Sequence, residues 1–338
     1  MPINRSKTVL ILGARGRFGL TASQVFAARG WRVLAQIRPG TAAPEIAGVT
    51  WLSLPVDDSA RLEAAARGAS VVIHALNPTY TRWETQARPL LDASVRLARL
   101  LGATLMLPGN VTNFGAAMPL VLEENTAQHA HTRKGQIRVA MEDHLRHLAT
   151  AGAVPSVVIR AGDFFGSGSG SWFDKVVAKD ITRGKMVYPG ALDVPTAWAY
   201  VPDLAETFVR VAARLLDTPE RLAPFEVLHF KGHTLTGNDW AAQLAEAASD
   251  HGWLPPGGAL RTASLPWRLI QAGGLLVPMW RELAEMRYLW QTPHGLAGDK
   301  LAALIGPVPH TELAPAVRQS LEALGKMRRL ACQAAVWA

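Results

Sequence analysis

Cysteine and long apolar segments are the clearest absences in this sequence. Of the 338 residues only Cys332 is a cysteine, so no disulfide can form within the chain; this is usual in a reducing compartment, and we expect the cytoplasm. The apolar run at residues 8–12 ends at Gly13, too early for a secretory signal. A later run, residues 269–280, is too short to cross a bilayer, so no membrane span is expected.

Metal-ligand clusters and blocks of like charge are missing as well. The histidines are scattered, and His129 and His131 have no carboxylate at a suitable spacing, so no metal site is expected. The net charge is +8, but Lys and Arg are dispersed and no nucleic-acid motif is present, which argues against a nucleic-acid partner. With 49% hydrophobic residues, the composition is typical of a globular protein of enzyme size.

The first third of the chain alternates short β-branched runs with helical stretches. Strands are predicted at residues 8–12, 32–37, 50–54, 70–75 and 104–108, and helices at 60–68 and 89–102, the second ending at Gly102. The strands are apolar almost throughout, as expected where helices cover both faces of a sheet. This alternation predicts an α/β Rossmann-type fold with a doubly wound parallel sheet.

Two later runs, residues 155–160 and 225–230, are predicted as further strands of the same sheet. The chain after residue 166 must then leave the sheet, return to it and leave again. We therefore expect a Rossmann domain at residues 1–165 and a smaller, interleaved C-terminal domain at residues 166–338.

A glycine-rich turn follows the first predicted strand. In "LILGARGRFG", Gly13, Gly16 and Gly19 are spaced G-x-x-G-x-x-G, with Arg15, Arg17 and Phe18 between them. Glycine permits a tight turn and close backbone approach, and the N-terminus of the following helix presents N–H groups to a pyrophosphate. In this strand-turn-helix context the pattern predicts a dinucleotide-binding site.

The second strand discriminates between the two nicotinamide cofactors. NAD sites usually carry Asp or Glu near the end of this strand, but no acidic residue occurs from Met1 to Pro44. Arg38 follows the strand instead, and with Arg15 or Arg17 it can pair with a 2′-phosphate. The sequence therefore favours NADP over NAD.

Five segments together resemble landmarks of the extended or atypical short-chain dehydrogenase/reductases, which include NAD-dependent epimerases and dehydratases. They are the glycine loop, "VDD" at 56–58, "VVIHALNP" at 71–78, "MLPGNVTNFG" at 106–115 and "YVPDLAETF" at 200–208. The resemblance implies that Asp57 lies beside the adenine and that His74, Ala75, Leu76 and Asn77 lie along the ribose and phosphates. It also implies that residues 160–166 lie near the nicotinamide.

The catalytic Tyr-x-x-x-Lys pair of that superfamily is missing. Aligned with Y-G-x-S-K-x-x-x-E, "KGQIRVAME" at 134–142 puts Lys134 in the place of tyrosine and Arg138 in the place of lysine. A slip of two residues would use Thr132 and Gln136 instead, and neither choice restores a phenol. The usual catalytic Ser/Thr falls at Asn110, with Thr112 close by. None of the four tyrosines, at 80, 188, 200 and 288, is followed by lysine four residues later.

Lys134 and Arg138 lie four residues apart on a predicted helix and so share a face. We expect Lys134 to carry the proton, Arg138 to bind the ribose, and Asn110 to polarise a carbonyl. The alternatives are a solvated Lys/Arg face, or another acid or base: His129, His131 or Asp163. Asp163, Trp172 and Trp198 are the expected substrate contacts, the two tryptophans lying in loops. Residues 265–290 form a lid, a dimer surface or a helix resting on a membrane.

The sequence thus predicts an NADP-dependent oxidoreductase that acts on a carbonyl or alcohol of a small molecule, with a rebuilt catalytic centre. A redox-neutral epimerase or dehydratase is the near alternative. A dinucleotide sensor without turnover is the alternative from another class, since a retired enzyme would also lose the tyrosine. A homodimer is left open beside a monomer.

Overall fold

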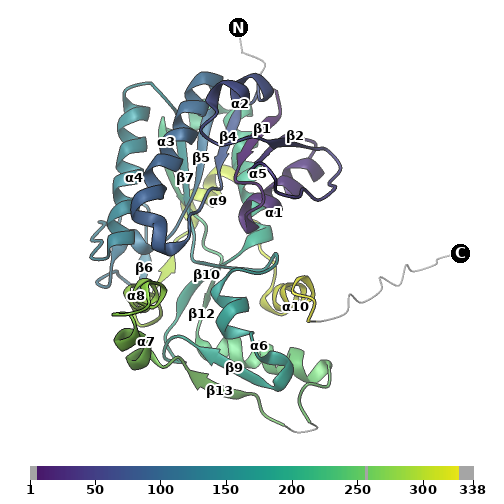
Figure 1. The fold of residues 1–338 in the computed structure, drawn as a ribbon, viewed down its shortest axis with the longest axis vertical. Helices are drawn as coiled ribbons and strands as arrows, with labels where there is room; N and C mark the ends of the chain where they lie inside the picture. The colour runs from purple at the N-terminus through teal and green to yellow at the C-terminus, as the bar shows by residue number, and fades with distance from the viewer. Residues whose placement is uncertain (1–5, 256–257, 327–338) are drawn as a thin grey trace, which may run out of the picture.

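The computed structural model describes residues 6–255 and 258–326. Within these residues, seven parallel strands form one sheet in the order β11-β7-β5-β4-β1-β2-β3 (Figure 1). They are β1 (Thr8–Leu12), β2 (Arg32–Ile37), β3 (Val49–Ser53), β4 (Val71–His74), β5 (Thr104–Gly109), β7 (Ser156–Arg160) and β11 (Phe225–His229). Each strand predicted from the sequence is present, so the Rossmann-type fold is confirmed.

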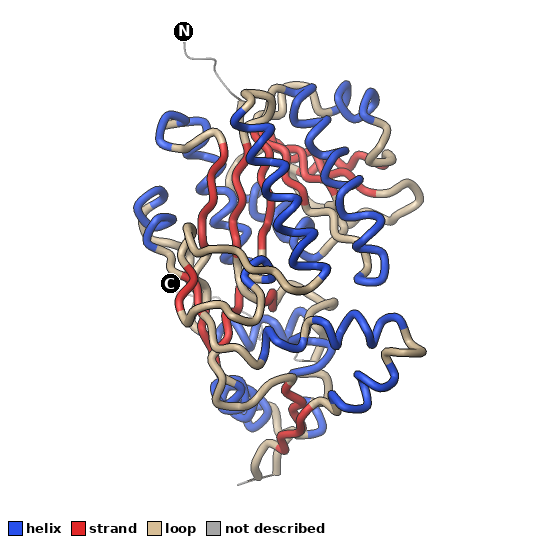
Figure 2. The backbone as a smooth tube through the Cα atoms, turned by 90° about the vertical axis from the view of Figure 1, so that its left-hand side faces the viewer, coloured by secondary structure: helices blue, strands red, loops and turns tan. Residues whose placement is uncertain are grey.

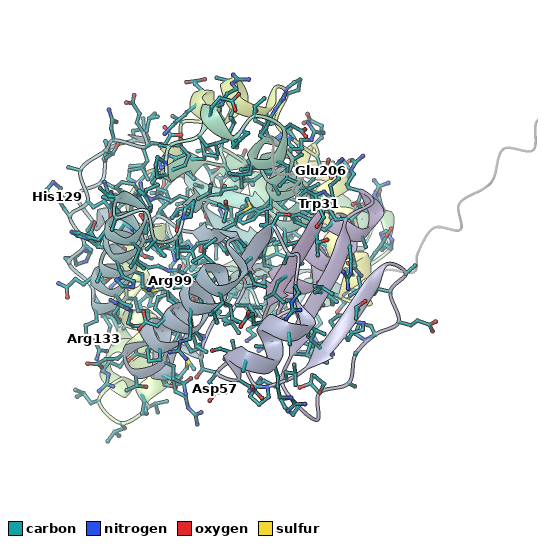
Figure 3. The ribbon with its side chains drawn as sticks, turned by 90° about the horizontal axis from the view of Figure 1, so that it is seen from above. Trp31, Asp57, Arg99, His129, Arg133 and Glu206 are labelled. Carbon is teal, nitrogen blue, oxygen red and sulfur yellow. The ribbon has the colours of Figure 1, made fainter. Side chains whose placement is uncertain are left out.

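Helices cover both faces of this sheet, because its strands are apolar on both sides. One face packs against α1 (Arg17–Ala28), α5 (Val201–Asp217) and α9 (Asp299–Ile305). The other packs against α2 (Ser59–Ala65), α3 (Trp83–Leu101) and α4 (Arg133–Thr150). The view from above separates Arg99 of α3 from Glu206 of α5 (Figure 3). Helix α3 begins earlier than predicted, and Gly102 ends it in the left-handed conformation, with φ +62°.

The strand order reverses between β1 and β4. From β1 the chain adds β2 and β3 toward one edge, and from β4 it adds β5, β7 and β11 toward the other. Ligands of doubly wound sheets bind at such a switch point, outside the carboxyl ends of the strands. The loops that follow β1 and β4 are therefore the first place to look for a site.

A second, smaller region lies below the sheet in Figure 1. Its strands are β8 (Asp163–Phe165), β10 (Thr196–Tyr200) and β12 (His233–Leu235) in one sheet, β9 (Lys185–Tyr188) paired with β13 (Arg261–Ser264), and β6 (Val121–Leu122) paired with β14 (Gly295–Leu296). Its helices are α6 (Gly237–Asp250), α7 (Trp267–Gly273), α8 (Pro278–Glu285) and α10 (Leu313–Ala323). Between these pieces the chain returns to the large sheet as α5, β11 and α9, which is the interleaving expected from residues 225–230.

Short helical turns complete the chain and carry several residues of interest. They are η1 (Tyr80–Arg82), η2 (Thr112–Phe114), η3 (Phe173–Val177), η4 (Ile181–Arg183), η5 (Pro219–Arg221) and η6 (Arg287–Trp290). Helices α7 and α8 form a hairpin that Figure 2 shows projecting from the lower part of the molecule. Leu275 and Leu276, at its turn, are exposed. No helix within the described ranges has both the length and the apolar character needed to cross a membrane.

Trp198 corrects one expectation. It lies in strand β10, with 0% of its surface exposed, and not in a loop beside a pocket. Its indole N–H donates to Thr196 Oγ1 at 3.0 Å, and its ring packs against Trp240. The segment Thr196–Tyr200 is buried along its whole length. The prediction that Trp198 lies in a loop is therefore wrong.

Candidate active site

The glycine loop after β1 lies directly against the end of β4. Gly13 has φ +79°, and a Cβ there would lie 3.0 Å from the carbonyl oxygen of Ala75. A Cβ on Gly19 would lie 2.6 Å from the Gly13 carbonyl oxygen. Gly16 immediately precedes α1 and is exposed. The loop therefore needs glycine for its own packing, and it leaves the N-terminal N–H groups of α1 at the open switch point.

Gln36 holds this loop in place and was not singled out from the sequence. Its side chain is buried at the end of β2, where Oε1 accepts from the Gly13 N–H at 3.0 Å and Nε2 donates to the Leu54 carbonyl at 2.7 Å. The amide thereby joins the glycine loop to the segment after β3. The available signal was one polar residue inside the otherwise apolar end of a buried strand.

The three arginines expected near a 2′-phosphate lie in two different places. Arg15 and Arg38 are exposed beside the loop and at the end of β2. Arg17 instead donates from Nη1 to the Phe164 carbonyl at 3.3 Å and from Nη2 to the Gly170 carbonyl at 3.1 Å. Arg17 therefore links α1 to the second region. Asp57 is exposed after β3, the place the resemblance gives to the adenine.

Lys134 is buried and ion-paired. Its side chain is 4% exposed, and its ammonium donates to carboxylates of both Glu282 and Glu285 of α8, at 2.7 Å for Glu285. Arg133 adds an ion pair to Glu282 at 2.9 Å. Burial raises the pKa of Glu282, but hydrogen bonding and charge from Lys134 and Arg133 outweigh it, and the pKa lies below its usual value. The α8 carboxylates therefore attach the hairpin to the start of α4.

Arg138, one turn further along α4, lies closer to the switch point. Its guanidinium carbon is 4.9 Å from the ring centre of Trp83, and Nη1 donates to the Pro108 carbonyl at the end of β5, at 3.4 Å. Burial lowers the pKa of Arg138, while the charges of Glu142 and Tyr80 raise it. Its buried Nε–H has no acceptor within residues 6–255 and 258–326. A buried donor of this kind fits a ligand that brings acceptor oxygens.

Asn110 and Thr112 are bonded to each other. The Asn110 carbonyl oxygen Oδ1 accepts from the Thr112 N–H at 3.0 Å and from its hydroxyl at 2.5 Å. This local turn leaves the Asn110 amide N–H₂ as the group able to reach outward. The hydroxyl of Tyr288 donates to the Thr112 carbonyl at 3.3 Å.

His129 and His131, the alternative bases, lie on the surface. Both are exposed, and His131 Nδ1 accepts a hydrogen bond from the Ala116 N–H at 3.2 Å. The ring of His131 packs against Tyr288, with the ring centres 4.7 Å apart.

Asp163 and Trp172 are brought together from the second region. The Trp290 indole N–H donates to Asp163 Oδ2 at 3.1 Å, and the ring centres of Trp290 and Trp172 are 4.1 Å apart. Burial raises the pKa of Asp163 to about 6, against the opposing effects of Trp290 and Arg17. Two of the three expected substrate contacts, Asp163 and Trp172, thus meet at Trp290.

Tyr80 is the residue that sequence reasoning passed over. It lies in η1, in the loop after β4, and the Lys134 nitrogen is 5.4 Å from its ring centre. Burial raises the pKa of Tyr80 to about 12, and the charge of Asp163 adds to this effect; a hydrogen bond from Trp172 and the charges of Arg17 and Arg138 oppose it. Tyr80 therefore lies among side chains from α1, α4, β8 and the loop after β8.

Glu142, the last residue of the helix pattern, has a structural partner. Its carboxylate pairs with Arg160 at the end of β7 at 2.6 Å, and both side chains are completely buried. The pair fixes α4 against the sheet. A buried pair of this kind costs much to break, since removing one member leaves the other charge uncompensated.

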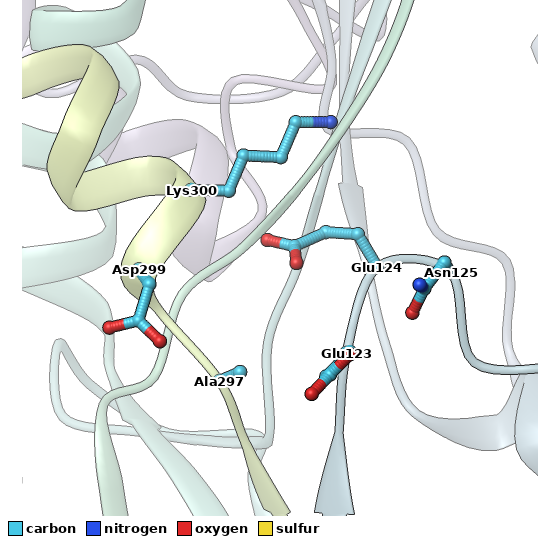
Figure 4. Close-up of a pocket in the computed structure, with 6 residues that line it drawn as sticks. All are labelled: Glu123, Glu124, Asn125, Ala297, Asp299 and Lys300. Atoms are coloured by element: carbon cyan, nitrogen blue, oxygen red, sulfur yellow. The ribbon is translucent and has the colours of Figure 1, made fainter.

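A surface cleft of about 440 Å³ has none of the site residues described above in its lining (Figure 4). It is lined by Glu123, Glu124, Asn125, Ala297, Asp299 and Lys300, none of which was predicted as a site residue. No group of three or more His, Cys, Asp or Glu side chains arranged to hold a metal occurs within the described residues.

Comparison with known proteins places this geometry in context. Residues 5–98, which include the glycine loop and strands β1 to β4, match the NmrA-like family. No curated protein sequence matches the chain significantly.

Similar solved structures cover nearly the whole chain. The UDP-glucose 4-epimerase of Brucella ovis, in complex with NAD, is 15% identical over 94% of this chain and 98% of its own, with a TM-score of 0.71. An epimerase from Methanothermobacter thermautotrophicus is 13% identical over 95% and 92%, with a TM-score of 0.73. The L-threonine 3-dehydrogenase of Trypanosoma brucei is 16% identical over 94% and 98%, with a TM-score of 0.69.

These likenesses concern the fold. The chain shares its Rossmann-type fold with these structures.

Proposed function

We propose that this protein is an NAD(P)-dependent oxidoreductase that acts on a carbonyl or alcohol group of a small molecule. The observation that carries the proposal is the glycine loop: it lies against the end of β4 at the switch point and leaves the N-terminus of α1 open. A redox-neutral epimerase or dehydratase would use the same hydride step twice. The similar fold of the Brucella ovis UDP-glucose 4-epimerase, which is in complex with NAD, supports this alternative.

The residues present fit a dinucleotide. Gly13, Gly16 and the α1 N-terminus would hold the pyrophosphate, and Asp57 would lie beside the adenine. Residues 75–77 and Arg138 would lie along the nicotinamide ribose. The buried Nε–H groups of Arg17 and Arg138, which lack acceptors within the described residues, match a ligand rich in oxygen. A bound nicotinamide supplies or accepts the hydride; the chain supplies orientation and the proton.

Asp163 and Trp172 would meet the substrate. They approach the switch point from the second region, next to Trp290. Tryptophan rings offer flat apolar walls, and a carboxyl with a raised pKa can donate or accept a hydrogen bond near neutral pH. This combination suits a small organic molecule with an apolar part next to the reacting oxygen.

The preference for NADP is the finer proposal, and Arg38 tests it. We expect Arg38→Ala to weaken NADPH binding by roughly tenfold, because one guanidinium–phosphate pair is lost, and to leave NADH binding nearly unchanged. Arg32→Ala is the matched control, since Arg32 is also exposed but lies at the opposite end of β2. The readout is the dissociation constant of each cofactor from fluorescence titration. Equal affinities of the wild type for NADPH and NADH would contradict the preference.

A dinucleotide sensor without turnover is the second candidate, and Lys134 favours it. The side chain expected to carry the proton is tied to Glu282 and Glu285. An oxidoreductase needs another proton carrier near the nicotinamide, whereas a sensor needs none. Oxidation of NADPH during a screen of aldehydes, ketones and quinones separates the two functions.

A further inference from the structure

We infer that Tyr80 is the proton donor and acceptor of this active site, replacing from the loop after β4 the tyrosine that α4 lacks. The inference rests on the proposed oxidoreductase function and names its catalytic residue. The phenol that α4 lacks would thus come from the loop after β4, at the carboxyl edge of the sheet.

The position of Tyr80 follows from the packing of its loop. The loop begins at Ala75, whose carbonyl oxygen lies close to Gly13 and Gly16, so its first residues border the predicted cofactor site. The Trp83 indole N–H donates to the Pro78 carbonyl at 3.1 Å, which closes the loop into a compact turn just before α3. Trp83 also packs under Arg138. The phenol is therefore held beside the two α4 positions at which the superfamily carries its catalytic pair.

Of the other three tyrosines, one is buried in a core and two donate their hydroxyl protons to protein acceptors. Tyr188 is buried in the core of the second region. Tyr200 donates its hydroxyl proton to Gln319 Oε1 at 2.7 Å, and Tyr288 donates to the Thr112 carbonyl at 3.3 Å. The Tyr80 hydroxyl donates to no protein acceptor within the described residues, and its side chain is half-buried. Its proton is thus not held by a protein acceptor there.

Burial and the charge of Asp163 raise the pKa of Tyr80 to about 12, so the phenol keeps its proton at neutral pH until a substrate oxygen takes it. The charges of Arg17 and Arg138 act in the opposite direction and favour the phenolate that remains after the transfer. The ammonium of Lys134 lies 5.4 Å from the ring centre, but Glu282 and Glu285 of α8 balance its charge.

In the reductive direction, hydride adds to the carbonyl carbon of the substrate, and the C=O π electrons move to the oxygen. That oxygen takes the Tyr80 hydroxyl proton, which gives the alcohol and leaves Tyr80 as phenolate. A proton from solvent restores the phenol. The sum is carbonyl, NAD(P)H and one proton giving alcohol and NAD(P)⁺, and oxidation of an alcohol follows the reverse path.

The first experiment measures turnover. On the best carbonyl compound of a panel of aldehydes, ketones and quinones, we expect Tyr80→Phe to lower kcat by roughly 100-fold or more while the dissociation constant of NADPH changes by less than about threefold. Tyr200→Phe is the matched control, since it removes one tyrosine hydroxyl that is bonded to Gln319. Lys134→Met should lower kcat by less than Tyr80→Phe. A larger loss for Lys134→Met, or full activity in Tyr80→Phe, overturns the inference.

The second experiment needs no substrate. The positive ring of bound NADP⁺ lowers the pKa of a nearby phenol, whereas the neutral ring of NADPH does not. At alkaline pH, adding NADP⁺ should therefore increase the ultraviolet absorbance of tyrosinate more than adding NADPH does. Tyr80→Phe should abolish this difference and Tyr200→Phe should keep it. A difference that persists in Tyr80→Phe overturns the inference.

The outcomes also separate the inference from the function on which it rests. If neither NADPH nor NADH binds, the proposed function fails, and the inference fails with it. If a cofactor binds and is turned over but Tyr80→Phe keeps its activity, only the inference fails. If NADPH binds tightly, no carbonyl compound is reduced and the NADP⁺-dependent tyrosinate signal is absent, the inference is overturned and the sensor gains support.

Discussion

Asp163 offers a test at the scale of one residue, because its ionisation opposes folding. Burial raises the pKa of Asp163 from 3.8 to about 6, so the folded state holds this proton more tightly than the unfolded chain does. The contribution of Asp163 to stability therefore falls as pH rises from about 4 to about 6, and it is constant above that.

We accordingly expect Asp163→Asn to be more stable than the wild type at about pH 7, and to gain little or nothing at about pH 4. Urea unfolding of both proteins at the two pH values measures the difference. Asp193→Asn, at an exposed carboxyl, is the control. An equal effect of Asp163→Asn at both pH values would show that burial does not perturb this carboxyl.

At this same scale, the sequence predicted the residues that belong to local patterns. The glycine loop is a local pattern of strand, turn and helix, and it folds as expected. Tyr80, Gln36 and Glu282 could not be found in this way, because each acquires its role from segments distant in the chain. Glu282 meets Lys134 across 148 positions, a separation that no spacing rule covers.

At the scale of elements, α8 is held to α4 by charge. Burial raises the pKa of Glu282, but Lys134 and Arg133 lower it below its usual value. The stability from this pairing is present above the unfolded-state pKa and is lost as pH falls through the folded pKa.

We therefore expect Glu282→Gln at neutral pH, or acid below the lowered pKa of Glu282 on the wild type, to loosen the α7–α8 hairpin. The measurement is hydrogen exchange of residues 267–285, which should become faster by about tenfold or more. Glu246→Gln is the control, since Glu246 is exposed on α6. Unchanged exchange in the hairpin would mean that its apolar contacts alone hold it.

The sequence predicted the long elements and missed the short ones. All seven strands of the large sheet were predicted, because both faces of each strand are covered and the apolar runs are continuous. Strands β8, β12 and β14 have two or three residues each, too few to show a period. Trp198 was misplaced for this reason, since the neighbours that bury β10 come from these short pieces.

At the scale of the whole molecule, the site forms only where the two regions meet. Arg17 crosses from the glycine loop to the Phe164 and Gly170 carbonyls, and Lys134 crosses from α4 to the hairpin. The chain passes repeatedly between the two regions: α5 and β11 belong to the large sheet and its helices, while the segments before and after them build the second region. The two regions are therefore in contact. The sequence predicted the return at residues 225–230 but not which side chains would face one another across the junction.

The most direct test of the account is a crystal structure of the protein with NADP⁺ bound. The account predicts the pyrophosphate at the glycine loop, Arg138 at the nicotinamide ribose, and the Tyr80 hydroxyl within about 4 Å of nicotinamide C4. A nicotinamide that lies beside Lys134, with Tyr80 turned away, or a cofactor bound elsewhere on the chain, would contradict it.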